Sequence, residues 1–117
     1  MVQFRRTAAW RKGLAETAAI FAALGDPTRL RLVNRLCERG PLSIAQLAVD
    51  EPVTRQAVSK HLQALEEAGI TRSSRHGRQR IWELRPDRLV EVRRHLETIS
   101  SQWDDAIGRL RKLVERD

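Results

Sequence analysis

The chain has 117 residues, of which 22 are Lys or Arg and 15 are Asp or Glu, so its formal net charge is +7. This length allows one domain with a modest core, and the basic excess fits a nucleic-acid partner, although many proteins carry such charge only for solubility. A single cysteine excludes an internal disulfide and no apolar run reaches the roughly 20 residues of a membrane span, so the composition predicts one cytoplasmic domain, residues 1–117, with no membrane partner.

A first helix is predicted over residues 7–24, where apolar residues recur at three- and four-residue steps and Gly25 ends the pattern. Its apolar stripe consists of Trp10, Leu14, Ala18, Phe21 and Leu24. A basic cluster lies at its start and consists of Arg5, Arg6, Arg11 and Lys12. The cluster could reach a phosphate backbone, but a charged helix start is more often simply solvated.

A second helix is predicted to open at Asp26 and Pro27, with the Asp as N-cap and the Pro at N1, where its missing N–H costs nothing. Its expected buried residues are Leu30, Val33, Leu36 and Cys37. Cys37 is interpreted as a small core residue, because no second thiol or histidine stands nearby to make a redox or metal site with it.

A helix-turn-helix is predicted over residues 43–69. Ser43 and Gln46 form a capping box that starts a short helix, whose inward residues are expected to be Ile44, Leu47 and Ala48. After a turn at residues 50–52, Thr54 is the expected N-cap of a longer helix. The apolar stripe of that helix consists of Val58, Leu62 and Leu65. In this arrangement the second helix enters the major groove of DNA.

The other face of this longer helix carries side chains that hydrogen-bond base edges and phosphates. The candidates for base edges are Arg55, Gln56, Ser59, Lys60 and Gln63, and the candidate for phosphate is Thr54. The acidic residues of this helix, Glu66 and Glu67, lie at its C-terminal end and the basic ones at its N-terminal end. The helix dipole favours the reverse order, so helix stability does not explain where these charges lie. His61 is a further candidate, for a hydrogen bond to DNA or to the turn.

A β-wing is predicted over residues 70–85, from two segments, 70–75 and 80–84, that flank a basic turn at residues 76–79. The absence of any acid from Thr71 to Trp82 suits contact with phosphates or entry of an arginine into the minor groove. The candidate DNA-binding residues here are Arg75, His76, Arg78 and Arg80. The alternative is an exposed strand edge that arginines keep soluble.

The longest predicted helix covers residues 86–115, with Pro86 at N1. Its apolar residues form a heptad seam of Leu89, Val92, Leu96, Ile99, Trp103, Ala106, Leu110 and Leu113. A domain of this size cannot cover the whole seam, so a second copy of the chain is the expected partner. The alternative is that the seam packs entirely on residues 7–24 of its own chain, and we expect both contacts. The predicted dimer interface consists of Trp10, Leu14, Phe21, Leu89, Val92, Leu96, Ile99, Trp103 and Leu110.

Four runs together resemble the ArsR/SmtB family of dimeric winged-helix transcriptional repressors: ALGDPTRLRLVNRL, SIAQLA, TRQAVSKHLQALEEAGI and RHGRQRIWELRP. The resemblance covers Phe21 to about Leu89. It implies a mainly α fold with a small β-wing, a winged helix-turn-helix in the order α-α-α-α-β-β-α, dimeric through its terminal helices. The recognition helix would begin at Thr54 and the wing would be Arg75 to Arg80. Repression rather than activation comes only from this resemblance.

Metal-sensing members of that family carry a cysteine pair in the helix before the turn, or paired histidines with carboxylates on the last helix. Residues 44–49 contain no thiol and the last helix has only His95, so the chain is closer to the branch without an identified ion, and we expect no metal and no cofactor. Glu91 and His95 stay open as ligands shared across a dimer, although their i, i+4 spacing is frequent by chance. No nucleophile stands beside a base, so we expect no enzyme activity.

The sequence thus predicts a homodimeric repressor that binds a pseudo-palindromic operator in double-stranded DNA near its own promoter. Two alternatives stay open. The first is a sensor of the same fold that responds to a metal or small ligand, and the second is a winged-helix module whose basic surface binds a protein. Gln56 and Ser59, which suit base edges, favour DNA over the protein partner.

Overall fold

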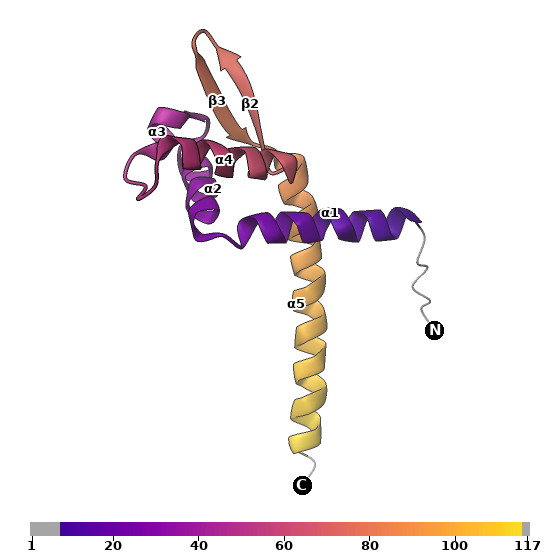
Figure 1. Cartoon of the computed structure of the whole chain (residues 1–117). Helices are drawn as coiled ribbons and strands as arrows, with labels where there is room; N and C mark the ends of the chain where they lie inside the picture. The colour runs from indigo at the N-terminus through magenta and orange to yellow at the C-terminus, as the bar shows by residue number, and fades with distance from the viewer. Residues whose placement is uncertain (1–7, 116–117) are drawn as a thin grey trace.

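The computed structural model describes residues 8–115, in which helices dominate and a small antiparallel sheet completes the domain. Figure 1 shows α2, α3 and α4 gathered at one end, the β2–β3 hairpin projecting beyond them, and α5 running away in the other direction. The elements are α1 (Ala8–Leu24), α2 (Pro27–Arg39), β1 (Leu42–Ser43), α3 (Ile44–Ala48), α4 (Arg55–Glu67), β2 (Thr71–His76), β3 (Gln79–Leu84) and α5 (Pro86–Val114). The predicted mainly α fold with a β-wing is confirmed.

The starts of α2, α3 and α4 are fixed by the predicted caps. The Asp26 carboxylate accepts a hydrogen bond from the Arg29 backbone N–H at 3.1 Å, and the Thr54 hydroxyl accepts one from the Ala57 N–H at the same distance. Ser43 and Gln46 complete both halves of the capping box. Each cap satisfies backbone donors that the first helical turn leaves free, so local sequence determines where these helices begin.

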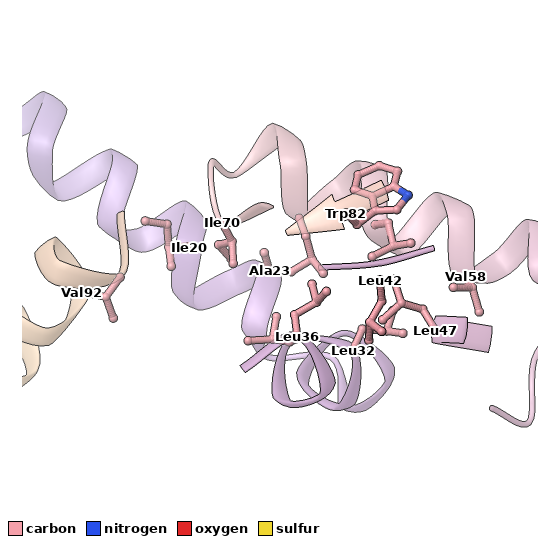
Figure 2. Close-up of a cluster of buried hydrophobic side chains, with 13 residues drawn as sticks. Ile20, Ala23, Leu32, Leu36, Leu42, Leu47, Val58, Ile70, Trp82 and Val92 are labelled. Atoms are coloured by element: carbon pink, nitrogen blue, oxygen red, sulfur yellow. The ribbon is translucent and has the colours of Figure 1, made fainter. Parts of the chain in front are cut away.

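The core gathers apolar side chains from α1 through the start of α5 (Figure 2). Leu62 and Leu65 of α4 are fully buried, as is Val58, which confirms the apolar stripe predicted for that helix. Trp82 of β3 is the largest buried side chain, and Val92 is the only residue of α5 in this core. The core therefore closes around α4 and leaves most of α5 outside it.

The buried stripe of α2 differs from the predicted one. Leu32, Val33 and Leu36 are buried, whereas Leu30 and Cys37 are exposed. With 3.6 residues per turn, both exposed residues lie roughly 100° around the helix from the centre of the buried stripe. The interpretation of Cys37 as a core residue is therefore wrong.

α1 turns a different face to the core from the one its apolar stripe indicates. Thr17, Ile20 and Ala23 are buried, whereas Leu14 and Ala18 are exposed. The buried residues lie next to the predicted stripe on the helix surface. The two faces meet at the last turn of α1, where Phe21 and Leu24 of the predicted stripe pack partly on the core.

The sheet has the strand order β1-β3-β2 and is antiparallel throughout. The predicted four-residue turn of the wing is wrong by one residue on each side, because His76 and Gln79 already pair and only Gly77 and Arg78 lie between the strands. Gly77 has a φ of +64°, which a two-residue hairpin turn requires at its first position. β1 was not predicted, since it is two residues long and forms only by pairing with β3, Leu42 opposite Trp82 and Ser43 opposite Ile81.

α5 extends far beyond the rest of the domain. The radius of gyration is 18.9 Å, whereas a compact domain of this length has about 13 Å. α1 crosses α5 near its N-terminal third (Figure 1), where Arg88 of α5 forms an ion pair with Glu16 of α1 at 3.1 Å. Leu96 and Trp103 lie past this crossing and are exposed. The alternative in which the seam packs entirely on α1 of its own chain is therefore wrong.

Candidate nucleic-acid interface

α4 holds its predicted polar face outward because its apolar stripe is anchored in the core. Thr54, Arg55, Gln56, Lys60 and Gln63 are exposed, and Ser59 is half-buried. The five helical residues of this set, from Arg55 to Gln63, fall within about 140° of one another around the helix axis. They form one continuous face of side chains that can donate and accept hydrogen bonds.

The turn before α4 is held by a buried carboxylate that sequence reasoning missed. The Glu51 side chain is fully buried and forms ion pairs with Arg31 at 3.1 Å and Arg35 at 3.0 Å, both on α2. Arg35 also donates to the Leu47 carbonyl at the end of α3. α2 therefore positions the turn, and through it the start of α4. Nothing in the sequence near Glu51 signals this role, since its partners lie 16 and 20 residues away.

His61 points from α4 to the start of α2. Its Nδ1 accepts a hydrogen bond from Arg29 Nε at 3.2 Å and lies 3.9 Å from an Asp26 carboxylate oxygen. The hydrogen bond from the Arg29 backbone N–H is the main reason that the pKa of Asp26 lies below its usual value. With Nδ1 occupied, His61 has only Nε2 left for another partner, so its role toward DNA stays a prediction.

One face of the wing is turned toward α4. Arg75 and Arg80 are directly opposite each other on β2 and β3, so their side chains share that face. Arg80 donates to the Ser73 hydroxyl at 2.8 Å, and Ser73 donates from its backbone N–H and its hydroxyl to Glu66 of α4, at 3.1 and 3.2 Å. These bonds fasten the base of the wing to the C-terminal turn of α4.

The opposite face of the wing carries different residues. His76 lies there, with its Nε2 3.0 Å from the Ser74 hydroxyl, and it lines a hollow with Pro41 and Ile81. Arg72 on the same face is paired with Glu83 at 2.8 Å. The structure therefore brings Arg75 and Arg80 to the side of α4, and it places His76 on the other side.

Between the wing and the N-terminal ends of α3 and α4 lies an open cleft of about 300 Å³. Its charged lining consists of Arg55 at the start of α4, Arg78 in the wing turn and Arg80 in β3. Ser43, Ile44, Ala45 and Gln79 complete the lining, so no acidic residue contributes to it. The geometry concentrates positive charge at one place on the face that carries the outward residues of α4.

The residues predicted for a dimer interface fall into two groups. Leu14, Leu96, Ile99, Trp103 and Leu110 are 40 to 66% exposed, so the chain itself leaves them uncovered. Val92 is buried, and Phe21 and Leu89 pack partly against the same core. The side chain of Trp10 and the whole of Arg5 and Arg6 lie outside the described part of the structure.

Glu91 and His95 do not form a metal centre with a third group. His95 Nδ1 lies 3.1 Å from the Glu91 carbonyl, and the Glu91 carboxylate lies 3.5 Å from Arg88. Within residues 8–115, no three His, Cys, Asp or Glu side chains gather as metal ligands would. Over the same residues, no helix combines the length and the apolar character that crossing a bilayer needs.

Comparison with known proteins adds family relationships to this geometry. A family model described as a helix-turn-helix domain matches residues 24–74. The HTH-type transcriptional regulator Rv2034 of Mycobacterium tuberculosis is 36% identical over 95 residues, which are 81% of this chain and 85% of that protein.

Solved structures agree with that relationship. An ArsR-like transcriptional regulator from Rhodococcus sp. RHA1 superimposes with a TM-score of 0.70 at 36% identity, over 86% of this chain and 93% of that one. A homodimeric winged helix-turn-helix DNA-binding domain from Mycobacterium bovis has a TM-score of 0.65 at 19% identity, over 92% of this chain and 95% of that one. The second likeness concerns the fold alone.

Proposed function

Because the chain belongs to the ArsR family of winged helix-turn-helix regulators and is a DNA-binding transcriptional regulator, we propose that it acts as a homodimeric repressor of a pseudo-palindromic operator. The observation that carries the proposal is the polar face of α4, held outward by three fully buried residues on its other side. Such a face presents hydrogen-bonding groups at a spacing that fits the major groove.

Within this proposal the exposed residues divide their roles. Gln56, Ser59, Lys60 and Gln63 would read base edges, because amides, hydroxyls and ammonium groups match the donors and acceptors of the major groove. Thr54, Arg75, Arg78 and Arg80 would hold the phosphate backbone, with a minor-groove contact open to the wing arginines. The first group sets sequence preference and the second fixes the position of the protein on the duplex.

The exposed seam of α5 supports dimerisation. Leu96, Ile99, Trp103 and Leu110 place a row of large apolar side chains in solvent, and covering them removes apolar surface from water. A second copy of the chain brings an identical seam, as a two-fold interface requires. The two α4 helices of the dimer would then meet half-sites about 34 Å apart, one turn of the duplex.

Repression follows from this geometry when the operator overlaps a promoter, since a dimer across two half-sites excludes the polymerase. We further propose that no metal is needed. The Glu91 carboxylate is paired with Arg88 at 3.5 Å, and His95 Nδ1 lies 3.1 Å from the Glu91 carbonyl, so two of the groups that a zinc site shared across the dimer would need are already engaged within the chain.

The test is a binding titration of the purified full chain with the duplex upstream of its own gene and with a scrambled duplex. Both are measured at two salt concentrations, with EDTA and with added zinc. A preference for the upstream duplex that survives EDTA is the expected result. Equal and steeply salt-dependent binding to both duplexes would contradict a sequence-specific repressor. A change of affinity with zinc would favour the metal-responsive alternative.

A further inference from the structure

We propose that the cleft between the wing and the N-terminal ends of α3 and α4 holds one backbone phosphate in each subunit, and that Arg55 is a phosphate-binding residue rather than a reader of bases. The inference rests on the proposed function. It assigns Arg55 a different role from the one its position on the helix predicts, because its side chain lines the cleft together with Arg78 and Arg80.

The charges of the cleft fit a phosphodiester. Within the described residues, none of the three arginines pairs with a carboxylate, whereas the carboxylates near the wing are engaged elsewhere, Glu83 with Arg72 and Glu66 with Ser73. Like charges gathered without a counter-ion repel one another, and a bound anion removes that repulsion. Guanidinium groups bind phosphate oxygens through paired N–H donors, which makes arginine well suited to this ligand.

The cleft is also partly organised before DNA arrives. Arg80 is held by its hydrogen bond to the Ser73 hydroxyl, and Ser73 is fastened to α4 by Glu66. Arg55 is fixed at its backbone because it is the first residue of α4, directly after the Thr54 cap. Side chains that are already oriented lose less entropy on binding.

Gln56 provides a matched control. It is the next residue of α4, it is exposed, and it does not line the cleft. Q56A should therefore change which base is preferred, whereas R55A should weaken binding to the upstream duplex and to the scrambled duplex by the same factor, about tenfold. Circular dichroism melting of each variant checks that the fold is intact.

The salt dependence of DNA affinity reports how many phosphate contacts a variant has lost. Each phosphate contact contributes about 0.9 to the slope of log K against log salt concentration. If the three arginines of the cleft hold one phosphate, the R55A/R78A/R80A triple variant should lose about 0.9 of this slope per subunit, and if they hold separate phosphates, it should lose at least about twice that. A loss near the larger value, or no loss, would overturn the inference.

A single-atom probe then identifies the phosphate. In a set of upstream duplexes, one phosphate at a time is replaced by a neutral methylphosphonate. We expect one position in each half-site that weakens the wild type more than it weakens R55A or R80A, because each variant has lost one of the arginines on that phosphate, and the position should be the same for both variants. Different positions for the two arginines, or a change of base preference in R55A, would refute the shared cleft. Equal binding of both duplexes by the wild type would reject the proposed repressor alone, since the salt slopes still report on the cleft.

Discussion

α4 and the distal half of α5 are both amphipathic helices, yet they end up in opposite situations. The large apolar residues of α4, Val58, Leu62 and Leu65, are fully buried in the core of their own chain, and its polar face is outward. The apolar residues of α5 beyond the α1 crossing lie in solvent. The proposed DNA-contacting unit therefore has its core within one chain, whereas the apolar face of distal α5 is left uncovered by the described part of its own chain.

The largest effect should come from the core beneath α4. Leu62→Ala removes a fully buried side chain and should lower the free energy of unfolding by about 2–5 kcal/mol, measured by urea denaturation. Leu113→Ala, at an exposed position of α5, is the matched control and should change little at concentrations where the chain is monomeric. Similar losses of unfolding free energy in the two variants would mean that distal α5 is packed as tightly as α4.

Trp103→Glu tests whether the exposed apolar seam of α5 is the surface through which two chains associate. It places a charge in the middle of the exposed seam and should weaken self-association by about 3 kcal/mol, roughly 100-fold, measured by sedimentation equilibrium. Ser101→Glu, on the opposite side of α5, should leave association unchanged. A dimer that tolerates Glu at position 103 would mean that the seam is not the interface.

Glu51→Gln tests whether α2 positions the recognition helix. The substitution keeps the size of the side chain but removes the charge opposite Arg31 and Arg35, and we expect a stability loss of about 1–3 kcal/mol together with weaker DNA binding. Glu97→Gln breaks an exposed ion pair with Arg93 and should cost at most about 0.5 kcal/mol. If the two substitutions cost the same, the buried pair has no special role.

The smallest effect is expected at Cys37. Cys37→Ser should change the free energy of unfolding by less than about 0.5 kcal/mol, since the residue is exposed. A maleimide should label Cys37 in the native protein as fast as in the unfolded chain. Protection from labelling would mean that the residue is covered, as the sequence pattern indicated.

What the sequence predicted well depends on neighbouring residues. Asp26, Ser43 and Thr54 cap helices through bonds to residues three positions on, so a short stretch of chain contains the whole cause. The stripe of α4 was equally clear because its period is regular. In α2 the period was less decisive, since Leu30 and Leu32 compete for the core and only packing selects Leu32.

The parts that could not be predicted depend on distant contacts. β1 exists because β3, about 40 residues later, offers it a partner at Trp82. Glu51 gains its role only when α2 lies beneath the turn. Arg55 joins the cleft only because the wing folds back beside α4, so its position in the helix alone suggested a reader of bases.

The hydrogen bonds that Ser73 donates to Glu66 and that Arg80 donates to Ser73 bear on which DNA the proposed repressor would select. They fix the position of the wing relative to α4 before any duplex binds. A duplex whose groove widths already fit the spacing between α4 and the wing would bind without being bent. A duplex that is stiffer, or whose grooves are wider, would have to be deformed at an energetic cost. Sequence selection would then extend to base pairs that no side chain touches, through the groove width and stiffness of the DNA between the contacts of α4 and those of the wing.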